Sequence, residues 1–596
     1  MMEEYKNRVN LIDEELVTAD RKYGLISFFR LVSFFAAVIA FYTGVTGGKK
    51  VLTLTGAVMA VLFIALLRVH AGLEEKRTCL RAEKEVIERY IARLSGEWRS
   101  FPDDGSEFLL KEDTLSRDLD LLGPASLYQL ISVAHTEEGR RKTAETISLQ
   151  NVEREEIAKR NEAVRELAGK KAFLIGFESV AARITKRRKH KEIEDYEEKT
   201  SLPFIVPVLM VLIPLINTAA VIAAVLKLIK PEMVLFAALG CLIITELFSS
   251  LRNNILYPIH VLGNSSRDYY ALLKLVKDEE FKSDILSGIK ERVSGKDGMI
   301  SAIKRLQVIS EADNISFNPI IHMILNGVIG WDFWLMKASD GWNKRFGGSV
   351  SECISCVADV EELCSLSVIS VIGKTCNPKI NYSAEDAKNG ELLSVENVYH
   401  PLIGTEKAVS NTARITGGAT VITGSNMSGK TTFLRTIAIN MALSYMGAEV
   451  CADRMELRYM KLFTSMRVMD DVAGGISTFY AEILRIKEMA EYISSDPEIP
   501  AACFIDEIFK GTNSADRIVG AENAILKLSR GKGFVIVSTH DFELCELKMS
   551  DGRTVMNYHF EEYYEDDELK FDYKLKDGRC TTRNAKTLLK MAGLMD

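Results

Sequence analysis

Two regions of the chain are far more apolar than the rest, and each is interrupted once by a short polar turn. In the first region the apolar stretches are residues 31–45 and 51–67, and in the second they are residues 203–226 and 233–248. Each stretch is about as long as a helix must be to cross a bilayer. The pattern predicts two transmembrane helical hairpins, with two buried core hairpins as the alternative.

Between and after these regions the pattern changes to charged residues at helical spacing. Residues 73–94 and 143–170 are rich in Glu, Lys and Arg, which predicts long amphipathic helices. Ser126 precedes a short apolar run and is a possible helix N-cap. Residues 252–385 are again mostly helical. These segments predict a mainly α-helical region around the apolar hairpins.

The C-terminal part alternates short apolar runs with helical segments. Residues 419–423 are typical of a buried parallel strand and residues 433–445 of a helix. The sequence T-G-S-N-M-S-G-K-T-T at 423–432 stands between them and fits the pattern Gly, four residues, Gly-Lys-Ser/Thr. Glycines let backbone N–H groups curl around an anion, and the helix N-terminus adds partial positive charge. We therefore predict a phosphate-binding loop.

The predicted ATP-binding residues of this loop are Gly424, Ser425, Asn426, Met427, Ser428, Gly429, Lys430, Thr431 and Thr432. Lys430 is expected to reach the β- and γ-phosphates, where it would assist catalysis. The Thr431 hydroxyl is expected to hold Mg²⁺.

Two further strands end in polar residues. An apolar run at residues 501–507 closes with Asp506 and Glu507, and a second run at 534–539 is followed by His540. We expect Asp506 to join Thr431 in holding Mg²⁺, and Glu507 to orient or deprotonate the attacking water. His540 can sense the γ-phosphate or position water.

A glycine-rich break precedes the helix predicted at residues 480–494. Its N-terminus is a second anion-binding end, and Ser477 is its natural side-chain donor. Within one chain this end has no obvious phosphate to meet. It makes sense if a second copy of the chain presents Ser477 across a dimer interface.

Length and composition limit the remaining choices. The 596 residues suggest three or four units, and the net charge of −7 gives no sign of a surface that binds nucleic acid all over. Ten scattered cysteines fit a reducing compartment. Cys353 and Cys356 are the only close pair, and a zinc site would need a second pair at similar spacing.

Two hairpins place the N-terminus, the middle segment and the C-terminal part on one side of the cell membrane. ATP is cytosolic, so we expect that side to be the cytoplasm. The basic run 183–191 agrees with this orientation, although lysines also stand in both hairpin turns; it could contact anionic lipid or DNA phosphates. A fifth apolar stretch, 319–336, contains polar residues. A crossing there would put the phosphate loop outside, so we predict a buried soluble helix.

Five motifs follow one another in the C-terminal part: His400-Pro401, the loop 423–432, Asp470-Asp471 with Ser477-Thr-Phe479, Asp506-Glu507 with Lys510-Gly-Thr-Asn513, and Ser538-Thr-His540. Their order and spacing resemble the ATPase domain of the MutS family of DNA mismatch repair ATPases. The segment 118–140 also looks like part of the family's helical core. The resemblance implies an ATPase domain related to the ABC and SMC types that works as a dimer, with each site completed by Ser477 of the other subunit.

The expected fold is an α/β P-loop NTPase domain with a mostly parallel sheet, preceded by a mostly helical MutS-core-like region that two transmembrane hairpins interrupt. The expected domains are a polar N-terminal segment (1–23), hairpin 1 (24–69), a cytoplasmic helical segment (70–200), hairpin 2 (201–251), a helical core or lever segment (252–384) and the ATPase domain (385–596). By the resemblance, Tyr399 and His400 are near the adenine.

The resemblance has departures. MutS proteins begin with a mismatch-reading domain and a connector domain, and neither fits the polar N-terminus and hairpin of this chain. The first hypothesis is a membrane-anchored MutS-like ATPase that uses ATP and Mg²⁺ in a dimer-coupled clamp cycle on mismatched or structured DNA. The second is a membrane ATPase that uses the same cycle on a protein or lipid partner. Export in the manner of an ABC transporter is less favoured, because the apolar helices carry few polar groups.

Overall fold

The computed structural model describes residues 1–150, 152–187, 202–256, 259, 265–295, 298–347, 349–382, 390–404, 407–425, 427–467, 478–510, 514–565 and 568–580. The chain divides into two compact units. Unit 1 comprises Met1–Ile91, Ala134–Gly139 and Ala172–Glu361, and unit 2 comprises Ala92–Val133, Arg140–Lys171 and Glu362–Asp596.

Unit 1 is helical throughout its described residues. Its helices are α1 (Met2–Thr46), α2 (Lys50–Ser95), α7 (Lys171–Arg187), α8 (Ile205–Val225), α9 (Glu232–Leu247), α10 (Ser249–Ile255), α12 (Ser266–Asp278), α13 (Asp284–Ser294), α14 (Met299–Asp313), the 3₁₀ helix η4 (Asn314–Phe317), α15 (Pro319–Ile329), α16 (Trp331–Phe346) and α17 (Ser349–Ile372). Helices α2 and α17 continue into unit 2.

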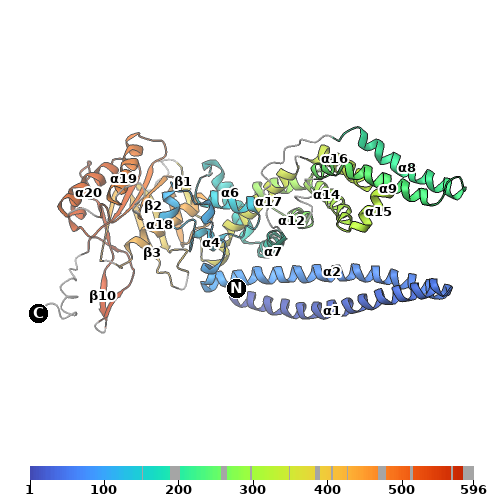
Figure 1. Cartoon of the computed structure of the whole chain (residues 1–596). Coiled ribbons are helices and arrows are strands. Elements are labelled where there is room, and N and C mark those ends of the chain that lie inside the picture. Colours follow the sequence, from blue (N-terminus) through green and yellow to red (C-terminus); the bar gives the residue numbers. More distant parts are fainter. Residues whose placement is uncertain are drawn as a thin grey trace. The chain divides into compact units, whose positions relative to one another are not determined.

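Helices α1 and α2 form one long antiparallel hairpin (Figure 1). They join through a tight turn in which Gly48 has a positive φ of 65°, a conformation that glycine adopts without strain. Arg8 pairs with Glu83, and Lys84 pairs with Asp13, both at 2.6 Å. The first apolar hairpin is therefore the distal part of longer helices, and the polar N-terminal residues continue its first helix.

Among the described residues, three helices are long and apolar enough to cross a membrane by length and composition: α1, α2 and α8. Two bent pairs also pass this test when each pair is taken together. Helices α9 and α10 are bent by 54°, and α15 and α16 are bent by 85°. The four crossings inferred from the sequence therefore stay a prediction. The fourth of them would be the bent pair α9–α10.

The prediction of a buried helix within residues 319–336 is wrong. The segment forms two helices, because Gly330 ends α15 in the left-handed conformation with φ of 64°. Asn326 and Gly327 are the buried residues of α15. Ile320 and Ile324, by contrast, are 71% and 58% exposed. The apolar face that suggested burial points outward, and the polar face points into the unit.

Unit 2 contains a six-stranded sheet in the order β12-β9-β4-β8-β7-β6. Its strands are β12 (Lys576–Asp577), β9 (Met556–His559), β4 (Gly418–Thr423), β8 (Phe534–Ser538), β7 (Ala501–Asp506) and β6 (Lys461–Ser465). All neighbours pair in parallel except β12 with β9. The sequence therefore predicted the mostly parallel sheet and its three most apolar strands correctly.

A second sheet has the order β1-β5-β2-β3. Its strands are β1 (Lys379–Asn381), β5 (Arg454–Arg458), β2 (Glu391–Val398) and β3 (Asn411–Thr416). Strands β10 (Glu562–Glu565) and β11 (Glu568–Phe571) form an antiparallel hairpin.

The described helices of unit 2 are η1 (Glu97–Ser100), η2 (Ser106–Phe108), α3 (Thr114–Asp118), α4 (Leu127–Ile131), α5 (Glu137–Ile147), η3 (Arg154–Glu156), α6 (Ile157–Ala168), α18 (Lys430–Tyr445), α19 (Thr478–Ser494), α20 (Ser514–Leu528) and η6 (Phe542–Glu546). Val421, Ile505 and Val537 belong to the core that α19 and α20 cover (Figure 1). Helix α18 contacts β7 and β8.

Two sequence predictions about the segments before the ATPase region have clear outcomes. Ser126 caps α4, since its hydroxyl accepts a hydrogen bond from the Gln129 N–H at 3.2 Å. The single long helix expected over 143–170 is wrong. The chain breaks between α5 and α6, where Leu149 has a φ of 59°, a conformation that no continuous right-handed helix contains.

Candidate nucleotide-binding site

The phosphate loop lies between β4 and the first turn of α18. Gly424 has a φ of 147°, and Gly429, the residue before the helix, has a φ of 110°. Side chains other than glycine are strained there. The Nζ of Lys430 donates to the carbonyl oxygens of Gly424 at 2.8 Å and Ser425 at 2.7 Å. Burial of the ammonium lowers the pKa of Lys430. A bound anion would compete with the two carbonyl oxygens for this desolvated cation.

The loop residues fit a phosphate group. The Ser428 hydroxyl is buried and has no hydrogen-bond partner among the described residues, and buried polar atoms normally have one. A Cβ on Gly429 would lie 3.2 Å from the Tyr573 ring. The space beside the Gly429 backbone therefore exists because this residue has no side chain. Met427 is 84% exposed. Asn426 and Ser477 lie outside the described residues.

Thr431 and Asp506, the predicted magnesium ligands, are in direct contact. The Thr431 hydroxyl donates to Asp506 Oδ2 at 2.7 Å. The other carboxylate oxygen accepts a hydrogen bond from Ser538, which is the cross-strand neighbour of Asp506. Hydroxyl and carboxylate oxygens are suitable ligands for Mg²⁺. The carboxyl ends of three adjacent parallel strands, β4, β8 and β7, thus bring the pair together.

Glu507 and His540, the other predicted catalytic residues, also meet. His540 Nε2 lies 3.1 Å from Glu507 Oε1, and Lys510 pairs with the second carboxylate oxygen. Burial opposes ionisation of Glu507, but these two contacts outweigh it and lower the pKa of the carboxyl group. Glu507 has a φ of 51°. Such backbone strain in a non-glycine residue is typical of functional positions.

The loop after Glu507 is held by α19. Glu482 accepts a hydrogen bond from the Phe509 N–H at 2.6 Å, and the rings of Phe479 and Phe509 lie edge to face at 5.9 Å. Burial raises the pKa of Glu482 to about 7. Helix α19 begins at Thr478, directly after the predicted Ser477, and its first two turns pack on the loop that follows the carboxylates through Phe479 and Glu482.

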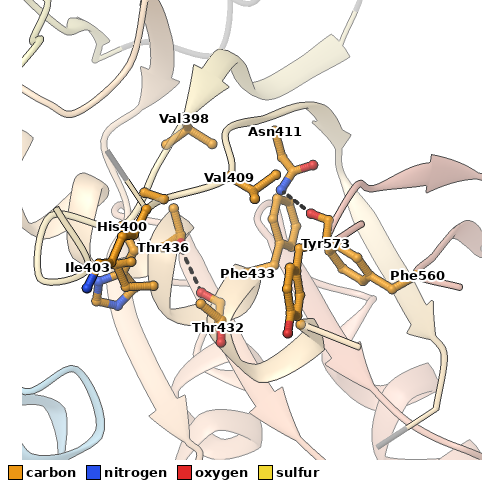
Figure 2. Close-up of a pocket in the computed structure, with 13 residues that line it drawn as sticks. Val398, His400, Ile403, Val409, Asn411, Thr432, Phe433, Thr436, Phe560 and Tyr573 are labelled. Atoms are coloured by element: carbon orange, nitrogen blue, oxygen red, sulfur yellow. Dashed lines mark hydrogen bonds between the residues drawn. The ribbon is translucent and has the colours of Figure 1, made fainter. Parts of the chain in front are cut away.

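A cavity of about 320 Å³ opens beside the loop and is absent from the sequence predictions. Figure 2 shows Phe433, Phe560 and Tyr573 on one side and His400 with Ile403 on the opposite side. Gly429 and Thr432 of the loop also line it. Its aromatic wall and its position next to the loop suit the base of a nucleotide. Tyr573 lies far from every motif in the sequence, so only the fold could identify it.

The two residues suggested for the adenine by resemblance have different positions. His400 lines the cavity. Its Nδ1 accepts a hydrogen bond from the Leu402 N–H at 3.3 Å, and burial, helped by the charge of Arg435, lowers the pKa of His400 to about 4. The ring is therefore neutral. Tyr399 is not among the residues lining this cavity, because its hydroxyl is bound to the backbone of Lys374.

A carboxylate from the β10–β11 hairpin also reaches the loop. Glu562 Oε2 accepts a hydrogen bond from the Ser425 hydroxyl at 2.6 Å. Glu562 is the first residue of β10, in an acidic segment of the chain. Its carboxylate lies where negative charge opposes the binding of a phosphate.

The segment around Asp118 joins the fold around the phosphate loop from a distant part of the chain. Asp118 is fully buried and accepts hydrogen bonds from the backbone N–H groups of Met466 and Arg467, both at 3.0 Å. Asp120 accepts from Arg467 at 3.0 Å and from Arg435 of α18 at 3.2 Å. This segment is therefore tied directly to the helix that follows the phosphate loop.

Comparison with known proteins supports the C-terminal assignment. Residues 420–595 match the family model described as MutS domain V. The DNA mismatch repair protein MutS of Natronomonas pharaonis is 28% identical over 251 residues, which are 41% of this chain and 28% of that protein. MutS protein homolog 4 of Mus musculus is 34% identical over 207 residues, which are 33% of this chain and 21% of that protein.

A third relative, the DNA mismatch repair protein MutS of Streptococcus agalactiae, is 29% identical over 250 residues. This chain spans about a quarter of the length of these relatives. The match confirms the resemblance inferred from the motifs: residues 420–595 of this chain match MutS domain V, and this region is similar to the MutS proteins named above.

Proposed function

We propose that this chain is a membrane-anchored, MutS-like ATPase that binds ATP with Mg²⁺ and hydrolyses it in a dimer-coupled cycle. The observation that carries the proposal is the convergence at one sheet edge of Lys430, the Thr431–Asp506 pair and the Glu507–His540 pair. Thr431 and Asp506 would hold Mg²⁺, which neutralises phosphate charge when bound. Glu507 would take the proton of the attacking water, and His540 would hold that carboxylate in place.

The second subunit enters the proposal through Ser477. The family resemblance gives this residue the role of completing the partner's site, and the described start of α19 at Thr478 is compatible with a helix end available to a partner. ATP would close the dimer and hydrolysis would release it. The relatives are named as DNA mismatch repair proteins, so DNA is the proposed substrate of the cycle.

The membrane part of the proposal rests on unit 1. Helices α1, α2 and α8, with the α9–α10 pair, supply four crossings, which would leave the N-terminus and domain V in the cytoplasm of a cell. Side chains such as Phe28 and Val221 are 61% and 48% exposed on these helices. Such continuous apolar surfaces mark sites of contact with membranes or proteins.

The test is ATP turnover by the full chain in detergent, measured with no DNA, homoduplex, mismatched duplex and branched DNA at low salt. Stimulation by any DNA, or binding to it, supports DNA as the substrate. Turnover that responds to none of them, with no binding at low salt, would overturn that part. In that case the second hypothesis, the same cycle acting on a protein or lipid partner, would take its place.

A further inference from the structure

Helix α15 turns an apolar face outward from unit 1. Ile320, Ile321, Met323, Ile324 and Val328 are each between 44% and 71% exposed. In water this arrangement would leave a contiguous apolar surface along the whole helix, which soluble proteins normally cover. The opposite face of α15 carries its buried residues, Asn326 and Gly327.

The buried face of α15 packs directly on the second apolar hairpin. A Cβ on Gly327 would lie 3.1 Å from the Ala238 carbonyl oxygen of α9, so the two helices approach as closely as small residues allow in membrane helix pairs. The Nδ2 of Asn217 on α8 donates to the carbonyl oxygens of Gly327 at 3.0 Å and Val328 at 3.1 Å. Helices α8, α9 and α15 are thus one packed group.

The outer faces of α8 and α9 have the same character as the outer face of α15. Val221 of α8 is 48% exposed, and Leu235 and Phe236 of α9 are 63% and 66% exposed. The surroundings that cover the apolar face of the α8–α9 hairpin must therefore also contact the apolar face of α15. If the hairpin lies in a bilayer, α15 is held against it at a position where its apolar face reaches lipid.

Both ends of α15 remain close to one guanidinium group. Arg252 on α10 lies 3.4 Å from Asp313, which precedes η4 and α15, and 3.5 Å from Asp332, which follows α15. The 11 residues of α15 span roughly 16 Å at 1.5 Å per residue, about half of a hydrocarbon core of roughly 30 Å. A helix this short, with both flanks at one charged residue, does not cross.

The polar side chains of this region satisfy one another. Asp332 Oδ1 lies 2.9 Å from His322 Nε2, and Asp332 Oδ2 accepts from Asn326 Nδ2 at 3.0 Å. The Asn326 side-chain oxygen in turn accepts from the Asp332 backbone N–H at 3.0 Å. Internal pairing of this kind is what apolar surroundings require of polar groups.

We propose that α15 is a third membrane element of this protein, a helix that enters the bilayer with its outer face in the hydrocarbon and returns to the same side. The partner of this surface is lipid. The inference rests on the proposed membrane anchoring, because it takes the α8–α9 hairpin as embedded. It adds a membrane contact without changing which side domain V lies on.

The first experiment measures lipid contact of the full chain reconstituted in phosphatidylcholine vesicles. An environment-sensitive fluorophore is attached to Ile324→Cys on α15, Val221→Cys on α8 or Lys304→Cys on the exposed side of α14. All variants carry Cys79→Ser, because Cys79 is the exposed native cysteine. Lipids with a nitroxide in the acyl chain should quench the Ile324 and Val221 probes to within about twofold of each other. They should leave the Lys304 probe unquenched.

The outcomes separate the two proposals. Quenching at Val221 without quenching at Ile324 overturns the role of α15 and leaves the anchoring intact; coverage of α15 by a second copy of the chain would give this result. Absence of quenching at both positions overturns the anchoring and the inference together. Met323→Cys, on the same exposed face, repeats the measurement if Ile324→Cys does not fold.

The second experiment tests the return to the same side. Lys304 precedes α15 and Lys337 follows it on α16, and both are exposed. In sealed vesicles of one orientation, a membrane-impermeant maleimide should label Lys304→Cys and Lys337→Cys from the same side. Labelling from opposite sides would make α15 part of a span and overturn the inference.

Discussion

Helices α8 and α18 are both rich in apolar residues, yet they bury different fractions of them. Helix α18 of domain V buries 13 of its 16 residues, including Lys430 and Asn440. Helix α8 of unit 1 buries three of its 21 residues, one of which is Asn217. The difference indicates two surroundings. Apolar side chains point inward where water surrounds the fold, and outward where the proposed lipid does.

The polar residues follow the same contrast. In unit 2 polar residues gather at the ends of adjacent strands, where Asp506 contacts Thr431 of α18 and Glu507 contacts His540. In unit 1 His322 and Asp332 pair with each other beneath an apolar exterior. Polar groups therefore converge on the proposed nucleotide site in unit 2 and stabilise the interior in unit 1. The predictions below test each side of this contrast.

The largest effect is expected for Lys430→Ala. Loss of the charged contact to phosphate should weaken ATP binding by more than about 100-fold and leave no measurable turnover. Titration with a fluorescent ATP analogue measures the loss. Lys487→Ala is the matched control, since Lys487 is exposed and contacts only Glu491 of its own helix among the described ion pairs. Unchanged affinity in Lys430→Ala would contradict the assignment.

Glu507→Gln should retain ATP binding but lower turnover by about 10²- to 10⁴-fold, because the amide cannot accept the proton of the attacking water. The variant should also accumulate as a dimer with ATP, which size-exclusion chromatography with light scattering detects. Glu543→Gln, a change of the same chemistry at the nearby η6 helix, is the control. Normal turnover in Glu507→Gln would remove Glu507 from the role of base.

Asp332→Ala tests the polar interior of unit 1. It leaves His322 and Asn326 without their shared acceptor, which should destabilise the protein by about 3 kcal/mol. Ile320→Ala, which shortens an exposed apolar side chain, should change stability by less than about 0.5 kcal/mol. Thermal unfolding in detergent compares the two. A larger effect for Ile320→Ala would reverse the contrast between the two units.

Tyr573→Ala tests the aromatic cavity beside the phosphate loop. Loss of a ring that stacks on a base should weaken ATP binding about tenfold, whereas Tyr573→Phe keeps the ring and should bind nearly as well as the parent. The ratio of affinities for ATP and inorganic triphosphate gives a second readout, because only ATP carries a base. An equal loss for both ligands would show that Tyr573 acts on the loop rather than on the base.

The smallest effect is expected for Glu482→Gln and depends on pH. The folded carboxyl group has its pKa raised to about 7 from 4.5, so between these values the unfolded state has already lost the proton. Stability from this group therefore falls as pH rises through that window. Glu482→Gln should be more stable than the parent at pH 8, by less than the limit of about 3 kcal/mol that a shift of this size sets, and equal to it near pH 4. A difference that does not vary with pH would contradict this origin.

The sequence predicted that Lys430, the Thr431–Asp506 pair and the Glu507–His540 pair lie close together, because their placement depends on local order along the chain. A glycine loop between a strand and a helix is a recurring arrangement at phosphate sites, and the strands that precede Asp506 and His540 end at the same edge if the sheet is parallel. It did not predict Tyr573, Glu482 or Glu562. These residues reach the site from distant elements, and their positions depend on how the strands and helices pack.

Helix α15 also shows a feature that the sequence cannot predict, namely the orientation of its apolar face. Its apolar residues at helical spacing established a helix with one apolar face, but not which way that face points. Burial of the apolar face is the expectation from the sequence, and the tertiary structure reverses it, because Asn217 of α8 and Ala238 of α9 contact the opposite face, which carries the polar and small residues.

The sequence by itself identified the resemblance of the C-terminal region to MutS domain V, the glycine loop between a strand and a helix, the carboxylates at a strand end and the apolar hairpins, since each depends on residue type and spacing within a short segment. Only the tertiary structure decided which side chains share the nucleotide cavity, how Asp118 and Asp120 attach to α18, and that α15 faces outward. Those outcomes depend on contacts between residues far apart in the chain, and periodicity within one segment carries no information about such contacts.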